Sequence, residues 1–250
     1  MLDFSLSLAK KAGSYLRENF GRDFCIEFKG RINPVTQVDK GSQVIICTSI
    51  ERYFPDHSIV SEESKRKDTG KKYTWFIDPL DGTVNYIHRI PIFCISMALY
   101  RSMEPFIGIC YNPMSEELFY AERGKGAFLN GEQVFVSSSS KLIDSLLVTG
   151  FPYSMDKIEP SMIRFKRLLG EAQGIRRIGS AALDLCYLAK GSFDGFWEVG
   201  LYPWDMAAGA LIVTEAGGKV TGLDGQPFDL VNGDILASND RIHEDLLKFM

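Results

Sequence analysis

The sequence is poor in histidine and cysteine, the residues that build most transition-metal sites. It has three histidines, His57, His88 and His243, and no two of them are close together. Its five cysteines are widely spaced and form no CxxC pair, which argues against a disulfide framework or a zinc ribbon. Cys94 and Cys110 lie in apolar, strand-like runs and are expected in the core. Any metal site is therefore expected to use oxygen ligands.

Basic charge and long apolar runs are also missing. The net charge of −4 gives no electrostatic basis for nucleic-acid binding, so no direct nucleic-acid partner is expected. The longest strongly apolar run, 90–100, is too short to cross a bilayer core of roughly 30 Å, so no membrane partner is expected either. Because no basic segment precedes an apolar one near Met1, we expect no signal peptide and a cytoplasmic location.

The residues that are present have the mix of a globular protein. Of 250 residues, 45% are hydrophobic and 24% are charged. An apolar stripe from Phe4 to Leu16 predicts a first helix that ends before Gly21, and a second helix is expected at 40–53. From 72 to 136 the pattern is that of strands with short connections, so antiparallel neighbours are expected. Asn130–Gly131 predicts a hairpin turn.

After residue 140 the predicted elements alternate between strand and helix. Strands are expected at 145–150, 174–178, 193–199, 219–222 and 234–238, and helices near 159–170, at 180–190, at 204–218 and from 240. This order predicts an α/β protein with two halves, 1–140 and 141–250, and helices covering the sheets on more than one side.

Acidic residues recur where a predicted strand or helix begins or ends. Singly, each has an ordinary explanation: a solvated loop at Glu62–Glu63, a strand that ends at Asp78 with a turn through Pro79 and Gly82, a helix cap at Asp205. Jointly, converging carboxylates would repel one another unless a cation shared the space. Hard oxygen ligands favour Mg²⁺ or Mn²⁺, and two such ions can polarise a phosphate and activate water.

Gly82 and Thr83, directly after Asp81, fit a phosphate site. Glycine lets the backbone approach a ligand closely, and backbone N–H groups at such a turn can hold phosphate oxygens. The hydroxyl of Thr83 can orient an attacking water.

Together, SEES at 61–64, WFIDPLDGTVNY at 75–86 and PWDMAAGALIVTEAGG at 203–218 resemble the inositol monophosphatase family, which is magnesium-dependent and lithium-sensitive. The resemblance extends to 124–131 and 178–200 and so covers nearly the whole chain. It implies a layered αβαβα sandwich and a homodimer. It also implies one compact catalytic unit, in which 1–140 supplies the large antiparallel sheet and most metal ligands, and 141–250 supplies Asp205 and substrate contacts.

The resemblance also implies roles for individual residues. Asp78 would bridge two ions, Glu63 would lie near a third, and Thr83 and Asp39, together with Glu62, would be the catalytic residues. The full set of implied metal ligands is Glu62, Asp78, the Leu80 carbonyl, Asp81 and Asp205. Phosphate would meet the backbone at Gly82 and Thr83, and the alcohol part would contact Asp81, Gly179, Ser180, Ala181, Glu198 and Asp205.

Two positions depart from the commoner family pattern. Tyr86 stands where phenylalanine is more frequent, and Ser180 stands where some relatives have threonine. The first adds a hydroxyl and the second keeps one, so neither is expected to disturb catalysis, although Ser180 leaves the choice of substrate open.

The expected activity is hydrolysis of a small phosphate monoester by metal-activated water, with two or three Mg²⁺ per subunit and Mn²⁺ as a possible substitute. Myo-inositol 1-phosphate is the favoured substrate. Histidinol phosphate, fructose 1,6-bisphosphate and 3′-phosphoadenosine 5′-phosphate remain alternatives, as does a regulatory, protein-binding role. Arg176–Arg177 could attract a substrate phosphate, but a surface or subunit ion pair is the favoured interpretation.

Overall fold

The computed structural model describes residues 1–23, 26–28, 34–63, 70–152 and 154–250. Ser64, the last residue of the 61–64 motif, lies outside the described residues. Among the helices that are described, none has the length and apolar character needed to span a bilayer.

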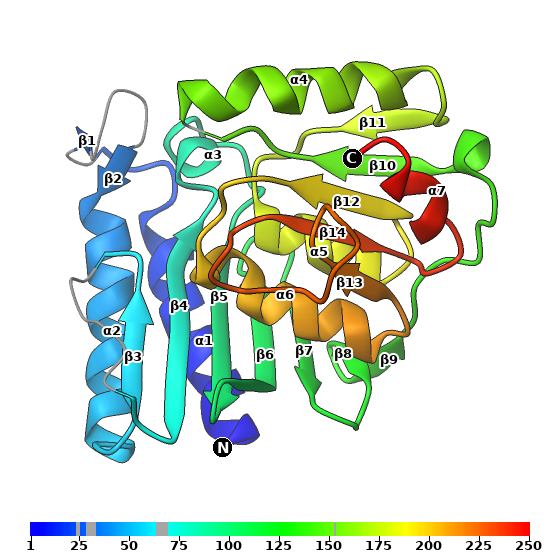
Figure 1. The fold of residues 1–250 in the computed structure, drawn as a ribbon. Coiled ribbons are helices and arrows are strands. Elements are labelled where there is room, and N and C mark those ends of the chain that lie inside the picture. The colour runs from blue at the N-terminus through cyan, green and yellow to red at the C-terminus, as the bar shows by residue number, and fades with distance from the viewer. Residues whose placement is uncertain (24–25, 29–33, 64–69, 153) are drawn as a thin grey trace.

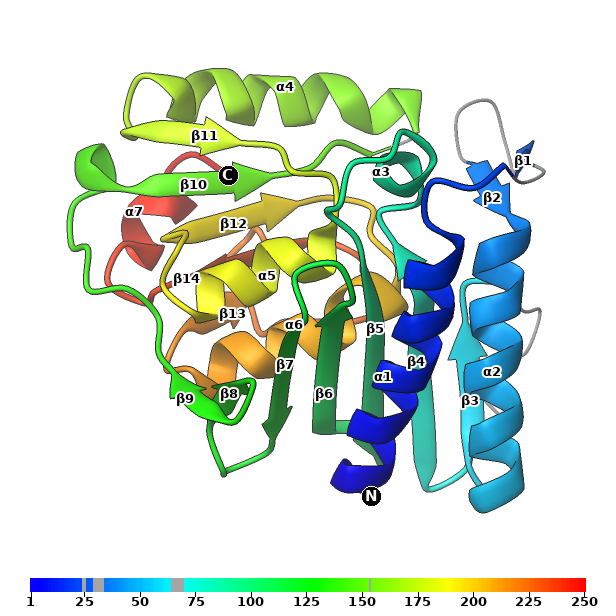
Figure 2. The same cartoon turned by 180° about the vertical axis from the view of Figure 1, so that it is seen from behind.

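Five layers alternate between helices and sheets, which confirms the predicted αβαβα sandwich (Figure 1). One outer layer is the helix pair α1 and α2, which packs on a seven-stranded sheet (Figure 2). A second helix pair, α5 and α6, lies between this sheet and a five-stranded sheet, and α4 and α7 cover the far side. The helix bounds are α1 Leu2–Asn19, α2 Gln37–Tyr53, α4 Met155–Leu169, α5 Ala181–Ala189, α6 Pro203–Glu215 and α7 His243–Leu247.

The seven-stranded sheet follows the chain order β3-β4-β5-β6-β7-β8-β9. All its neighbours are antiparallel except β3 and β4, which run parallel. Asn130 and Gly131 both have positive φ at the tip between β8 and β9, which confirms the predicted hairpin turn. The bounds are β3 Ser58–Ser61, β4 Tyr73–Asp81, β5 Cys94–Arg101, β6 Glu104–Asn112, β7 Glu117–Glu122, β8 Ala127–Leu129 and β9 Glu132–Val134.

The five-stranded sheet has the order β11-β10-β12-β14-β13 and is mixed. Strand β10 runs parallel to both β11 and β12, and the other pairs are antiparallel. The bounds are β10 Leu146–Thr149, β11 Gly174–Arg176, β12 Gly195–Glu198, β13 Lys219–Thr221 and β14 Ile235–Ser238. Four short elements complete the described part of the fold: the strand pair β1 Ile26–Phe28 and β2 Pro34–Thr36, the helix α3 Thr83–Ile87 and the 3-10 helix Leu142–Asp144.

The two faces of the seven-stranded sheet serve separate cores. Along β5, Ile95, Met97 and Leu99 pack toward α1 and α2, whereas Cys94 and Ala98 join the core around α5 and α6. This is the period-two alternation of a strand that is buried on both faces. The predicted core positions of Cys94 and Cys110 are confirmed, since both are fully buried. A third, smaller core lies between the five-stranded sheet and the layer of α4 and α7.

Several helix boundaries differ from those predicted. Helix α2 begins at Gln37 rather than 40, because Thr36 caps it and Asp39 completes a capping box. Helix α4 begins at Met155 rather than near 159, and it contains Pro160 inside its second turn. Helix α7 begins at His243, three residues later than predicted.

Candidate active site

A β-bulge near the end of β4 brings two aspartates to the same side of the sheet. Asp78 pairs with Ser96 and Asp81 pairs with Cys94, so three steps along β4 match two steps along β5. In a regular strand, residues three apart point to opposite faces, and the extra residue cancels this difference. The expected turn at Pro79 was therefore wrong: the strand continues through a bulge to Asp81, and the chain turns only at Gly82.

The turn at Gly82 leads directly into α3. Gly82 has φ of +95°, and a Cβ there would lie 3.0 Å from the Ile92 carbonyl oxygen, so both conformation and space require glycine. The bulge is fixed on both sides: the Leu80 N–H donates to Asp78 Oδ1 at 2.9 Å, and Ser42 Oγ donates to the Pro79 carbonyl at 2.8 Å. Asp78 and Leu80 thereby have defined orientations.

Thr83 and Asp39 contact each other although they are far apart in the sequence. Thr83 Oγ1 lies 2.9 Å from Asp39 Oδ1 and 3.0 Å from the Leu80 carbonyl oxygen, so its one proton can go to either acceptor. The other oxygen, Asp39 Oδ2, accepts from the Thr36 N–H at 2.8 Å and from the Thr36 hydroxyl. Burial raises the pKa of Asp39, while the hydrogen bonds from Thr36 and Thr83 lower it.

Glu62 enters the same region from the end of β3. Because β3 and β4 are parallel, their carboxyl ends meet at one edge of the sheet, which brings Glu62 next to the β4 bulge. The Glu62 N–H donates to the Ile77 carbonyl at 3.2 Å. Gln43 Oε1 accepts from the Glu63 N–H at 3.1 Å and from the Ser61 hydroxyl, so α2 fixes this segment.

Asp205 is both a cap and a pocket residue. Its Oδ2 accepts from the Tyr202 N–H at 2.8 Å in a capping box at the start of α6. The Asp205 carboxyl also lines the pocket beside Asp81. Asp205 therefore caps α6, as the ordinary interpretation expects, and also lines the pocket, as the functional interpretation expects.

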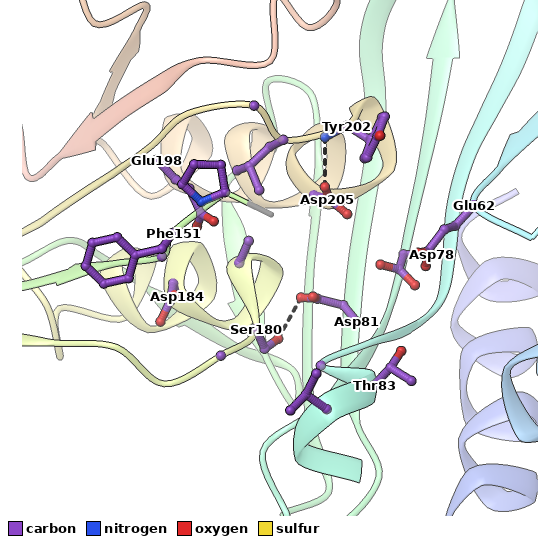
Figure 3. Close-up of a pocket in the computed structure, with 18 of the residues that line it drawn as sticks. Glu62, Asp78, Asp81, Thr83, Phe151, Ser180, Asp184, Glu198, Tyr202 and Asp205 are labelled. Carbon is purple, nitrogen blue, oxygen red and sulfur yellow. Dashed lines mark hydrogen bonds between the residues drawn. The ribbon is translucent and has the colours of Figure 1, made fainter. Parts of the chain in front are cut away.

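Asp81 connects the first motif to the start of α5. Its Oδ2 accepts from Ser180 Oγ at 2.6 Å and from the Ala182 N–H at 2.8 Å (Figure 3). Ser180 is the N-cap of α5, and its hydroxyl also accepts from the Leu183 N–H at 3.3 Å. Asn85 adds a second link, since its side-chain amide donates to the carbonyls of Ile92 and Ile178 at 2.8 Å each.

Glu198 lies at the end of β12, on the side of the pocket away from Glu62 and Asp78 (Figure 3). Its carboxyl fills the space above Gly150, where a Cβ would lie only 2.2 Å from Glu198 Oε2. Gly150 thus leaves room for this side chain. Burial, together with the charge of Asp81, raises the pKa of Glu198 to about 8, partly offset by Arg177.

One pocket contains every site residue predicted from the sequence except Asp39 and Glu63. Asp39 reaches the pocket through Thr83. Tyr86 does not line the pocket, and its hydroxyl donates to the Leu16 carbonyl at 2.7 Å. The predicted residues that line the pocket are Glu62, Asp78, Leu80, Asp81, Gly82, Thr83, Gly179, Ser180, Ala181, Glu198 and Asp205.

The charge of this pocket is strongly unbalanced. Of the described residues that line it, six are acidic and one, Arg177, is basic. Burial and mutual repulsion raise the pKa values of Asp78 and Asp205 well above their ordinary range, and that of Asp81 to about 6. A phosphate dianion would be repelled unless cations were bound with it.

The donor set fits Mg²⁺. It consists of carboxylates and a backbone carbonyl, which are hard oxygen ligands, without histidine or thiolate. Within the described part of the chain, no three acidic, histidine or cysteine side chains lie as close together as the ligands of a bound metal ion. Carboxylates spread along a pocket wall suit Mg²⁺, because this ion keeps several waters and takes few protein ligands together with substrate phosphate oxygens.

Two charged pocket residues were missed by the sequence analysis. Asp184 lies within the apolar run of α5, where no motif singled it out, and Arg177 had been interpreted as part of a surface or subunit ion pair. A single charged residue in an otherwise apolar helix, as in AALDLCYLA, was the available signal for Asp184. For Arg177 the signal was its position two residues before Gly179.

The fold and the site define a class of protein, that of layered αβαβα sandwiches with an acid-lined pocket where the layers meet. The model of the inositol monophosphatase family matches residues 1–249, and the chain belongs to that family.

Relatives of known name cover nearly the full chain. An inositol-1-monophosphatase of Synechocystis is 43% identical over 248 residues, covering 98% of this chain and 86% of that protein. Nus factor SuhB of Escherichia coli is 40% identical and covers 100% and 95%. The crystal structure of extragenic suppressor protein suhB from Bartonella henselae has a TM-score of 0.95 at 37% identity, covering 99% and 97%.

Proposed function

We propose that this protein is a Mg²⁺-dependent phosphatase of a small polyol phosphate, with myo-inositol 1-phosphate as the preferred substrate. The observation that carries the proposal is the pocket itself: six acidic residues and one basic residue surround a threonine that is hydrogen bonded to a buried aspartate. Family membership and the inositol-1-monophosphatase of Synechocystis support the same activity.

We assign the metal ligands to Glu62, Asp78, the Leu80 carbonyl, Asp81 and Asp205, which would hold Mg²⁺ with Asp78 as the central ligand and Glu63 nearby. When bound, Mg²⁺ would neutralise the phosphate and make water a stronger acid. The protein's own part is to hold these carboxylates fixed through the β4 bulge, the α6 cap and the Ser180 contact.

Thr83 and Asp39 move the proton of the attacking water. Thr83 Oγ1 accepts a proton from the water and passes its own proton to Asp39 Oδ1, 2.9 Å away. Burial raises the proton affinity of Asp39, which suits a terminal acceptor. The water oxygen then bonds to phosphorus in line, the bond to the substrate oxygen breaks, and the departing alkoxide takes a proton from solvent water. Gly82 and Thr83 hold the phosphate through their backbone N–H groups.

The far side of the pocket receives the alcohol part of the substrate. Asp81, Gly179, Ser180, Ala181, Glu198 and Asp205 would contact it. Burial raises the pKa of Glu198 to about 8, and a protonated carboxyl both donates and accepts hydrogen bonds as a ring hydroxyl does. A substrate amine would pair with an ionised Glu198, so histidinol phosphate remains the alternative substrate.

A phosphate-release screen tests the proposed substrate. Purified protein with Mg²⁺ would be offered myo-inositol 1-phosphate, fructose 1,6-bisphosphate, histidinol phosphate and 3′-phosphoadenosine 5′-phosphate, each with a matched EDTA sample. The highest kcat/KM is expected for inositol 1-phosphate, with complete loss in EDTA. Equal turnover of all four would contradict the substrate assignment, and turnover that survives EDTA would contradict the metal dependence.

A second candidate function is protein binding, because one relative at 40% identity is a Nus factor. The six acidic residues that line the pocket favour catalysis, since carboxylates that repel one another are costly to retain without an ion. Phosphate release that requires Mg²⁺ separates an enzyme from a purely binding protein, and a protein without any such activity would favour the second candidate.

The remaining expectations complete the proposal. We infer a homodimer, inhibition by lithium through displacement of one Mg²⁺, and a cytoplasmic location without a direct nucleic-acid partner. We also infer that the halves 1–140 and 141–250 act as one catalytic unit. The pocket draws Asp78 from the first and Asp205 from the second.

A further inference from the structure

Asp184 is a buried acid that the reaction described above does not use. It lies in α5, whose other residues in the run AALDLCYLA carry no charge, and only 1% of it is exposed. Its Oδ1 has no hydrogen-bond partner among the described residues. Since buried polar atoms are normally hydrogen bonded, this oxygen requires an explanation.

Helix capping does not supply one. Asp184 is in the first turn of α5, where a negative charge is favoured by the helix dipole. However, the N–H groups of this turn already have acceptors: Ser180 Oγ accepts from Leu183, and Asp81 Oδ2 accepts from Ala182. Burying a carboxyl costs more free energy than its interaction with the helix dipole recovers. An apolar residue at position 184 would therefore stabilise the fold better.

The position of Asp184 points to a ligand. It lines the pocket on the Glu198 side, away from Glu62 and Asp78 (Figure 3). Its charged neighbours are Glu198, Asp81 and Arg177. Asp184 and Glu198 are thus two buried carboxyls, from α5 and β12, that flank the space assigned to the alcohol part of the substrate.

We propose that Asp184 is a specificity-determining residue that hydrogen bonds to a hydroxyl of the substrate's alcohol part, next to Glu198. This inference rests on the proposed function and deepens it. A hydroxyl matches the surroundings better than a second phosphate, because a phosphate would face two acids and only Arg177 as a counter-charge. A hydroxyl can also donate to an ionised carboxyl or accept from a protonated one.

The test compares two substrates that share a phosphate monoester. Myo-inositol 1-phosphate carries ring hydroxyls, whereas p-nitrophenyl phosphate carries none. Asp184→Leu is expected to lower kcat/KM for inositol 1-phosphate by at least about tenfold, mainly through KM, and to leave that for p-nitrophenyl phosphate within about twofold. Asp184→Asn keeps a donor and an acceptor at the same place and is expected to lose less.

Thermal unfolding in EDTA gives a readout that is independent of activity. If Asp184 serves the ligand, Asp184→Leu should melt no lower than the wild type, because it removes an unpartnered buried oxygen. Asp194→Asn is the matched control. Asp194 is also a buried acid, but it accepts from Ser137 Oγ and from the Leu146 N–H at 2.7 Å, and it does not line the pocket. This control should melt lower and keep the wild-type substrate ratio.

The possible results separate the role of Asp184 from the proposed function. Equal losses on both substrates, no loss on either, or melting lowered as in Asp194→Asn would contradict the role of Asp184 and leave the proposed function standing. A wild type that hydrolyses p-nitrophenyl phosphate but not inositol 1-phosphate would contradict the proposed substrate and, with it, the hydroxyl contact.

Discussion

At the scale of single residues, the contact between Thr83 and Asp39 gives the pocket a route for a proton. Thr83 lines the pocket, whereas Asp39 is only 1% exposed and is fixed by Thr36. A buried acid with a raised pKa can accept a proton only through the neighbour that connects it to the pocket.

Removing the Thr83 hydroxyl should therefore slow the reaction without unfolding the protein. Thr83→Val is expected to lower kcat by about 10²- to 10⁴-fold at saturating Mg²⁺, the usual contribution of a positioned proton carrier. Thr83→Ser is the control and should retain most of the activity, because it keeps the hydroxyl. Comparable kcat values for the valine and serine variants in a phosphate-release assay would exclude the relay.

Glu198 should make the metal-free protein less stable as the pH rises. Its pKa is about 8 in the folded protein and 4.5 ordinarily, so between these values the folded state holds a proton that the unfolded chain has released. The stabilisation from this proton is complete below about pH 4.5 and is lost as the pH rises through 8. In between, the free energy of unfolding falls by up to about 1.4 kcal/mol per pH unit.

Denaturant unfolding in EDTA from pH 5 to 9 measures this effect. The wild type should lose more free energy of unfolding across the range than Glu198→Gln, which has no proton to release. Parallel curves for the two proteins would show that Glu198 titrates normally.

At the residue scale, sequence reasoning succeeded where residues form motifs and failed where they stand alone. The spacing of Asp78, Asp81, Gly82 and Thr83 and the family resemblance led to residues that do share one pocket. Asp184 was missed because only the fold shows that its face of α5 is turned toward a cavity rather than toward the apolar core.

At the scale of elements, the site depends on how strands and helices end. The β4 bulge places Asp78 and Asp81 on one side, and the parallel pairing of β3 with β4 adds Glu62. The first residues of α5 and α6 then face these strand ends. The elements themselves were predictable from periodicity, but the bulge was not, because Pro79 indicates a turn and a bulge equally well.

The double role of Asp205 can be separated with two substitutions. Asn can still accept from the Tyr202 N–H, so Asp205→Asn should keep the α6 cap and lose the ligand, whereas Asp205→Ala should lose both. Both variants are expected to lose activity on the order of 100-fold or more. In denaturant unfolding, the alanine variant should be about 1 kcal/mol less stable than the asparagine variant. Equal stability would mean that the cap contributes nothing.

At the scale of the whole molecule, the pocket lies where the two sheets and the middle helix layer meet. Glu62 and Asp78 come from the seven-stranded sheet, Glu198 comes from the five-stranded sheet, and Asp205 comes from α6 between them. A sequence pattern indicates that these strands end, and that α6 begins, near an acidic residue. It cannot show that ends more than 100 residues apart meet, because that depends on the packing of the layers.

Magnesium should stabilise the whole fold through this junction. Mg²⁺ at about 100 times its dissociation constant would add about 2.7 kcal/mol, which raises Tm by roughly 5–10 °C for a chain of this size. Differential scanning fluorimetry in EDTA and in MgCl₂, with NaCl at matched ionic strength as the control, measures the shift. A Tm that follows ionic strength alone would show that the acidic residues bind no divalent ion.

The central claim is that Asp78 holds the ions that drive phosphate hydrolysis, and its replacement by asparagine tests that claim most directly. Asp78 is 3% exposed, and Asn has nearly the same shape without the charge. Phosphate release from myo-inositol 1-phosphate would be measured for both proteins at saturating Mg²⁺, with circular dichroism as the check on folding. We predict that Asp78→Asn keeps the fold and has no detectable turnover. Near-normal turnover by a well-folded Asp78→Asn protein would contradict the account.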